Sequence, residues 1–197
     1  MPESYAELQL DALRELANIG SGTAATALSS MLGRPVDISV PTALALPVAD
    51  AVDAAGEPDA VVTAVVLPLV GDLDAIALLL FAREDAAALC ALLGVDVASE
   101  VGVSALAEIG NILGSAYIGA LTTMTALALE PRPPATATDM LGAIVSSVLA
   151  GNARETDIAL LLDSELTVEG VECSLSFMLA PGRRGVAEIL ARLGLED

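Results

Sequence analysis

The chain repeats one stretch: Asp11-Ala-Leu-Arg-Glu15-Leu-Ala-Asn18 is followed, 93 residues later, by Ser104-Ala-Leu-Ala-Glu108-Ile-Gly-Asn111. A proline stands at the same distance from each copy, since Pro41 and Pro134 both lie 23 residues after the asparagine. Further positions match at this offset, among them Leu13 with Leu106 inside the stretch and Leu28 with Leu121 beyond it. These matches indicate an internal duplication.

Both copies lie in long segments whose apolar residues recur at helical spacing, over residues 4 to 32 and 99 to 127. On a helix, positions i, i+4 and i+7 fall close to one line. We therefore expect two polar stripes on helix surfaces: Asp11, Glu15 and Asn18 in the first copy, and Ser104, Glu108 and Asn111 in the second.

The remaining patterns follow one order in both halves. Strands are predicted at 36 to 41 and 129 to 138, hairpins at 61 to 69 with 73 to 81 and at 157 to 163 with 171 to 179, and helices at 83 to 93 and 186 to 193. Residues 50 to 59 are rich in Ala, Asp, Gly and Pro, which favours a loop. A helix over Met140 to Ala150, with Asp139 as N-cap, has no clear counterpart in the first half.

This order predicts the α+β class. We expect one internally duplicated domain, made of pseudo-symmetric halves at about 1 to 97 and 98 to 197. Its strands would form a mainly antiparallel sheet, covered by the two long helices, which a pseudo-two-fold axis would relate.

The charge balance limits the partners of the chain. It has 27 acidic and 8 basic residues, a net charge of −19, and no lysine. Such a chain is expected to repel nucleic acid and anionic membranes. Solubility and adaptation to a salt-rich, halophile-like cytoplasm both explain this acidity and remain open. No uninterrupted apolar run reaches the roughly 18 residues of a membrane span, and the N-terminus has no signal-peptide pattern, so we expect a cytoplasmic protein without membrane insertion.

The residue types exclude several kinds of catalysis. The chain has no histidine, which removes Ser-His-Asp and Cys-His mechanisms. Its two cysteines, Cys90 and Cys173, lie in apolar runs far apart and are predicted to be reduced packing residues. One glutamate per polar stripe and no histidine give too few ligands for a metal, so no cofactor of its own is expected.

The Glu and Asn of each stripe have a simpler chemistry. An asparagine carboxamide both donates and accepts hydrogen bonds and can orient a water molecule, and a glutamate can pair with a cation on a partner protein. The alternative is that each stripe is only the solvated face of an amphipathic helix. The Glu and Asn recur at one offset although neighbouring positions differ, as Arg14 and Ala107 do, and this favours a functional role for the pair.

Both copies resemble the signature of the CheC family of chemotaxis phosphatases, which is related to CheX and to the phosphatase part of FliY. In that signature Asp or Ser is followed by Glu four residues on, Asn three further and Pro 23 beyond. Asp11, Glu15, Asn18 and Pro41 match it, as do Ser104, Glu108, Asn111 and Pro134.

The resemblance implies an aspartyl-phosphate phosphatase acting on the phosphorylated response regulator CheY in two-component signalling. Asn18 and Asn111 would orient the attacking water, and Glu15 and Glu108 would pair with a lysine of the regulator. Asp11 and Ser104 would give local support. The regulator would carry the Mg²⁺.

The resemblance also implies CheD, a receptor-modifying deamidase, as a partner. The apolar face of the helix Asp139 to Ala150 is a candidate docking element, and packing of that face on the sheet is the equal alternative. An alternative function is a mainly non-catalytic adaptor that binds phosphorylated CheY, CheD or both.

Overall fold

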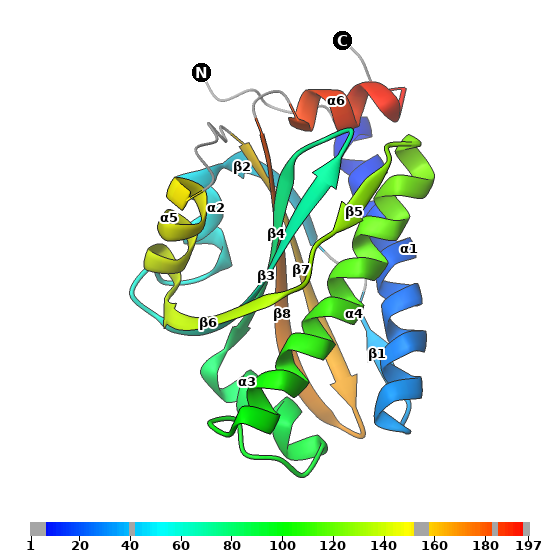
Figure 1. Ribbon diagram of the computed structural model, residues 1–197. Helices are drawn as coiled ribbons and strands as arrows, with labels where there is room; N and C mark the ends of the chain where they lie inside the picture. The colour runs from blue at the N-terminus through cyan, green and yellow to red at the C-terminus, as the bar shows by residue number, and fades with distance from the viewer. Residues whose placement is uncertain (1–6, 40–41, 152–157, 183–184, 195–197) are drawn as a thin grey trace.

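The computed structural model describes residues 7–39, 42–151, 158–182 and 185–194 of the 197-residue chain (Figure 1). The helices are α1 (Glu7–Leu32), α2 (Val48–Ala55), α3 (Arg83–Leu92), α4 (Glu100–Thr125), α5 (Leu141–Gly151) and α6 (Gly185–Arg192). The strands are β1 (Val36–Ile38), β2 (Thr42–Pro47), β3 (Val61–Gly71), β4 (Ala75–Ala82), β5 (Leu129–Pro131), β6 (Ala135–Met140), β7 (Ile158–Val168) and β8 (Val171–Pro181).

The strands form one sheet in the order β1-β7-β8-β4-β3-β5, with β2 also beside β7 and β6 also beside β3. The pairings are antiparallel. Each half lends its first two strands to the hairpin of the other half, because β1 and β2 pair with β7 while β5 and β6 pair with β3. The predicted α+β class and antiparallel sheet are confirmed.

Helices cover both faces of this sheet (Figure 1). The larger core lies between the sheet and the layer that contains α1 and α4, and the smaller core lies between the sheet and the α2–α5 pair. Strand β4 contributes to both cores, since Leu79 and Phe81 point into the larger one and Leu78 and Leu80 into the smaller. A central strand buried on both faces explains the uninterrupted apolar run of β4.

Two expectations about the α2–α5 pair were wrong. Residues 50 to 59 are not a loop throughout, because α2 occupies Val48–Ala55 and buries Ala51 and Val52. The second-half helix also has a counterpart, since α2 begins 93 residues before α5. The Ala, Asp, Gly and Pro content of residues 50 to 59 concealed a helix too short to display a clear period.

The start of α5 also differs from the prediction. Asp139 and Met140 belong to β6, and the helix begins at Leu141. The Asp139 carboxylate still accepts a hydrogen bond from the backbone N–H of Met140, at 2.8 Å. Asp139 therefore forms this hydrogen bond at the end of β6. It is not the N-cap of α5, because Met140 directly precedes the helix.

Helix α4 combines length with high apolarity. By length and composition alone it would pass as a membrane span, but half of its most apolar window is buried inside the protein. Small residues allow this burial, because Gly110 lies against Val65 and Gly114 against Leu67 of β3. A core helix of a globular domain accounts for the same features.

The contact at Gly110 generates a stability prediction. A Cβ atom built on Gly110 would lie 2.6 Å from the Cβ of Val65, which is fully buried. We expect Gly110→Ala to destabilise the fold by about 1–3 kcal/mol, because neither helix nor strand can yield freely in a packed core. Denaturant unfolding of the purified variant measures this.

Gly119, on the exposed side of the same helix, is the matched control. A Cβ there would meet nothing within 4 Å. Gly119→Ala should therefore raise stability by roughly 0.5–1 kcal/mol through helix propensity alone. Equal effects of the two substitutions would contradict the assigned packing of α4 on β3.

Candidate functional site: two polar stripes on paired helices

The first stripe lies on the outer surface of α1. Asp11, Glu15 and Asn18 are all exposed, whereas Leu13 and Leu16 on the opposite side of the helix are buried in the larger core. The helical period produces this separation, since apolar residues every three to four positions fix which side faces the sheet.

The second stripe occupies the corresponding positions of α4. Ser104 and Glu108 are exposed and Asn111 is partly buried, while Leu106 and Ile109 point into the core. The two stripes therefore share orientation as well as sequence, and differ in the burial of the asparagine.

The two prolines are placed unequally. Pro134 lies between β5 and β6 and is partly buried. Pro41 lies outside the described residues. The proline of the second copy therefore marks the bend at which the chain leaves β5 and continues antiparallel to β3 as β6.

The polar side chains of the stripes differ in their partners. Asp11 pairs with Arg14 at 2.6 Å, one turn along α1, and this pair has no equivalent in α4, where Ala107 replaces the arginine. Within the part of the chain that the structure describes, the side chains of Glu15, Glu108 and both asparagines make no hydrogen bond or ion pair. These four groups are thus available to a partner molecule.

A buried contact fixes the two helices against each other. Gly20 of α1 faces the ring of Tyr117 of α4, and a Cβ on Gly20 would lie 2.4 Å from the Cδ1 of that ring. The Tyr117 hydroxyl is 3.0 Å from Ser21 Oγ and 3.4 Å from Ser164 Oγ of β7, so it links α1, α4 and the sheet. Gly20 therefore permits the close approach of the second helix.

The helices run in opposite directions, so the two motifs lie toward opposite ends of the helix layer. In Figure 1 the colour of α1 lightens downward, whereas that of α4 advances from green to yellow-green upward. The contacts between the helices also indicate opposite directions, because Leu13 and Leu16 near the start of α1 line the same apolar cavity as Ile118 and Leu121 near the end of α4. Each motif occupies the first half of its helix, which leaves two separate surfaces.

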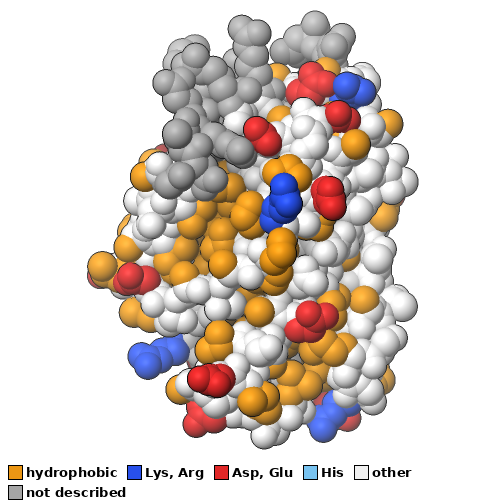
Figure 2. Space-filling view, viewed as in Figure 1, with side chains coloured by type: hydrophobic (Ala, Val, Ile, Leu, Met, Phe, Trp, Pro, Cys, Tyr) orange, Lys and Arg blue, Asp and Glu red, His pale blue; other side chains and the backbone are white. Residues whose placement is uncertain are grey.

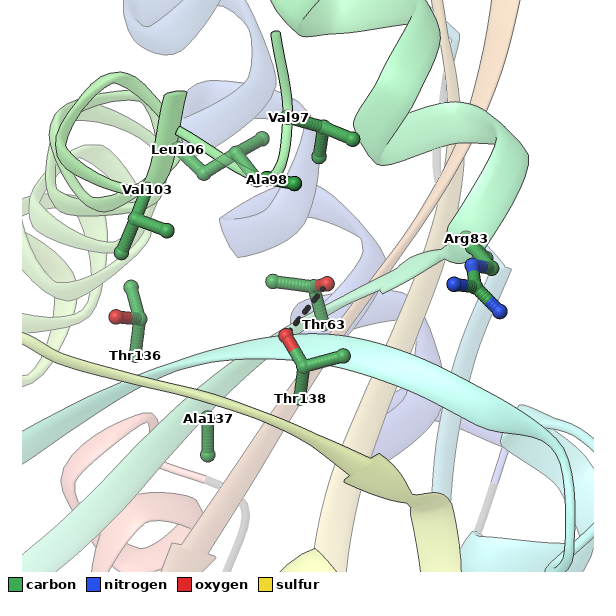
Figure 3. Close-up of a pocket in the computed structure, with 9 residues that line it drawn as sticks. All are labelled: Thr63, Arg83, Val97, Ala98, Val103, Leu106, Thr136, Ala137 and Thr138. Carbon is green, nitrogen blue, oxygen red and sulfur yellow. Dashed lines mark hydrogen bonds between the residues drawn. The ribbon is translucent and has the colours of Figure 1, made fainter. Parts of the chain in front are cut away.

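A cavity of about 330 Å³ lies beside the second motif (Figure 3). Val103 and Leu106, which flank Ser104 and precede Glu108 on α4, form one wall. Its other lining residues come from β3, β6, the start of α3 and the segment before α4: Thr63, Arg83, Val97, Ala98, Thr136, Ala137 and Thr138. In Figure 3 the threonines of β3 and β6 face the apolar wall of α4 across the cavity.

The cysteines lie in the interior, as predicted. Cys90 and Cys173 are at most 1% exposed. Burial raises the pKa of the Cys90 thiol, and it raises that of Cys173 to about 11. Both thiols therefore stay protonated at neutral pH and are poor nucleophiles. No group of three or more His, Cys, Asp or Glu that could hold a metal occurs among the described residues.

Comparison with known proteins gives the family. A model described as the CheC-like family matches residues 8–44, which contain the first motif with its proline. The chain is 33% identical over 175 residues to the CheY-P phosphatase CheC of Bacillus subtilis, a match that covers 81% of this chain and 80% of that protein. The chain belongs to the CheC-like family.

Two further matches agree with this membership. The Bacillus subtilis flagellar motor switch phosphatase FliY is 28% identical to this CheC-like chain over 139 residues, which cover 67% of the chain and 36% of FliY. The crystal structure of Thermotoga maritima FliY superimposes with a TM-score of 0.73 at 17% identity, and covers 98% of this chain and 99% of that one. The structural match shows the shared fold.

Sequence reasoning missed the cavity beside the second motif and the role of Tyr117. The cavity is assembled from β3, α3, the segment before α4, α4 and β6, so no local pattern announces it. Tyr117 carried a signal, because it is one of only four aromatic residues and lies in a helix of otherwise smaller side chains. A lone large residue of that kind requires a gap in its neighbour, which Gly20 supplies.

The hydroxyl of Tyr117 yields a second stability prediction. Tyr117→Phe leaves the buried Ser21 and Ser164 without this partner, and we expect a loss of about 1–3 kcal/mol in the free energy of unfolding. The exposed Ser115→Ala on the same helix should change stability by less than about 0.5 kcal/mol. Calorimetry or denaturant titration measures both.

A triple variant tests whether unpaired hydroxyl groups cause this loss of stability. If unpaired hydroxyls cause the loss, adding Ser21→Ala and Ser164→Ala to Tyr117→Phe should cost less than the three single effects together. Simple additivity would show that the hydroxyl network is not what Tyr117 contributes.

Proposed function

We propose that this chain is a chemotaxis phosphatase that hydrolyses the aspartyl phosphate of a CheY-type response regulator. The observation that carries this proposal is that both Glu-x-x-Asn pairs lack partners within the described structure, with Glu15, Asn18 and Glu108 exposed and Asn111 partly exposed. The 33% identity to a protein named CheY-P phosphatase CheC supports it. A protein of this kind would act in the cytoplasm, where response regulators are found.

The chemistry suits a site without a nucleophile. An aspartyl phosphate is an activated acyl phosphate, so its hydrolysis needs chiefly a water molecule held in line with the phosphorus. The carboxamides of Asn18 and Asn111 project from rigid helices and can hold that water by donating to or accepting from it. No covalent intermediate forms on this chain.

Glu15 and Glu108 have a docking role in this proposal. Each carboxylate lies about one turn before its asparagine on the same side of the helix, at a distance along the helix axis of roughly 4.5 Å. Pairing with a lysine of the regulator would place the asparagine above the phosphoryl group. The Mg²⁺ belongs to the regulator, and no step assigned to this chain runs through it.

A non-catalytic adaptor is the alternative with the same surface. Unpartnered Glu and Asn side chains would serve binding of the phosphorylated regulator equally well. The two functions differ in one measurement, since an adaptor binds the regulator without accelerating its loss of phosphate.

The asparagines generate the decisive prediction. We expect the double variant Asn18→Ala, Asn111→Ala to lose about 100-fold or more of the acceleration of dephosphorylation, because the attacking water is no longer oriented. Each single variant should retain the activity of the other site. A time course of phosphate loss from a purified, phosphorylated CheY-type regulator measures this.

The chain offers a matched control on the same two helices. Ser30→Ala and Thr123→Ala remove exposed polar groups 12 residues beyond Asn18 and Asn111. This pair should leave turnover unchanged. Retained activity in the double asparagine variant, with its circular dichroism spectrum intact, would overturn the proposed mechanism.

We also propose a restricted docking surface for a CheD-type deamidase. Leu141, Ile144 and Val145 of the expected apolar face are buried in the smaller core, which favours packing as their role. Met140, at the end of β6, is 45% exposed. It is therefore the large apolar side chain of this segment that a partner can contact.

Charging this residue tests the surface. Met140→Glu should weaken CheD binding by about tenfold or more, because it places a charge in an apolar contact. Ala150→Glu, at an exposed position of α5, serves as the control for added charge. Unchanged affinity of the Met140 variant in a binding titration would remove α5 and its approach as the docking element.

A further inference from the structure

The cavity beside the second motif contains an unused cation. Arg83 lies at its rim as the first residue of α3, and its guanidinium makes no hydrogen bond or ion pair within the described residues. By contrast, Arg14, Arg34 and Arg192 each pair with a carboxylate of this chain. In a protein with a net charge of −19, an unpaired guanidinium at the rim of a cavity is a candidate site for an anionic group.

Hydroxyl groups add to the donors. Thr63 and Thr138 hydrogen-bond each other at 3.1 Å, so the pair keeps one hydroxyl proton for another acceptor. Thr136 makes no side-chain hydrogen bond within the described residues. The donors of the cavity are spread along it, because Figure 3 shows Thr136 on one side, Arg83 on the other and the Thr63–Thr138 pair between them, an arrangement that suits an extended acidic segment.

The opposite wall is apolar and partly exposed. Val103 of this wall is 42% exposed, and Leu106 beside it is buried. Figure 2 shows acidic and basic side chains dispersed singly over this side of the molecule, with apolar side chains between them. An occupant with an apolar body and an acidic end fits this arrangement.

The first half has apolar residues at the described positions that correspond to these threonines. Thr63 of β3 lies opposite Thr138 of β6 in the sheet. At the corresponding position of the other hairpin, Leu160 of β7 lies opposite Ala45 of β2. Ala43, 93 residues before Thr136, is buried at 1% exposure, and Leu160 is buried at 5%. The threonines are thus replaced by apolar residues, and Ala43 and Leu160 belong to the larger core.

We propose that this cavity binds an acidic, partly apolar segment of the response regulator when the regulator docks on the second motif. The inference rests on the proposed function, because it takes Glu108 and Asn111 as the docking site. Continuity supports it, since Val103 and Leu106 flank Ser104 on the same helix. The two motifs then differ in affinity: the second engages the regulator through the motif and the cavity, the first through the motif alone.

The test isolates each site in the full chain. Glu15→Arg disables docking at the first motif, and Glu108→Arg disables it at the second. The ligand is a CheY-type regulator loaded with Mg²⁺ and beryllofluoride as a phosphoryl mimic, and calorimetric titration gives the dissociation constant. Arg83→Glu is added to each background.

We expect Arg83→Glu to weaken binding about fivefold or more in the Glu15→Arg background, and to change it less than about twofold in the Glu108→Arg background. Thr136→Val, which keeps the shape and removes the hydroxyl, should weaken binding in the first background alone. Arg192→Glu on α6 is the control for charge reversal and should be neutral in both.

The outcomes separate the two proposals. Unchanged affinity on Arg83→Glu in the Glu15→Arg background overturns the cavity as a binding site and leaves the phosphatase proposal standing. An equal loss in both backgrounds also overturns it, because the effect is then general electrostatics. Two other outcomes overturn the docking role of the motifs themselves. In one, neither Glu15→Arg nor Glu108→Arg binds the regulator. In the other, the variant that carries both substitutions binds it as tightly as the unmodified chain.

Discussion

The contact between Gly20 and Tyr117 is the constraint on which the helix layer depends. Because Gly20 has no side chain, the tyrosine ring of α4 can lie directly on the backbone of α1. The tyrosine hydroxyl then joins Ser21 and Ser164, and its ring lies 4.8 Å from that of Phe177 on the sheet, centroid to centroid. These contacts fix the rotation of both helices about their axes, and this rotation decides which residues of each helix face outward.

The sheet gives both motif helices a common base. Each half supplies β1–β2 or β5–β6 to the hairpin of the other half, so neither half completes its own part of the sheet. The proposed orientation of a water molecule requires a rigid support, because a shift of about 1 Å in a positioned group already costs much of the rate. The exchange of strands provides such support to two surfaces at once.

The two halves match at the motifs and differ in the residues around them. Tyr117 corresponds to Ala24 and Gly20 to Leu113 at the 93-residue offset, so the central contact is itself asymmetric. The same holds beside the motifs, where Thr138 and Thr63 take the places of Ala45 and Leu160. The two halves therefore share the polar groups assigned to the chemistry and differ in what lies around them.

The sequence alone determined the 93-residue repeat of the motif, the α+β class, the hairpins and the exposed position of Glu15, Asn18 and Glu108, because these follow from local periodicity and one fixed offset. It did not determine α2, whose 8 residues are too few to display a helical period. Only the tertiary structure decided the exchange of strands between halves, the contact of Tyr117 with Gly20, and the cavity that Arg83 shares with Thr136. These depend on residues brought together from distant elements, and a packing contact of that kind leaves no pattern in the order of the chain.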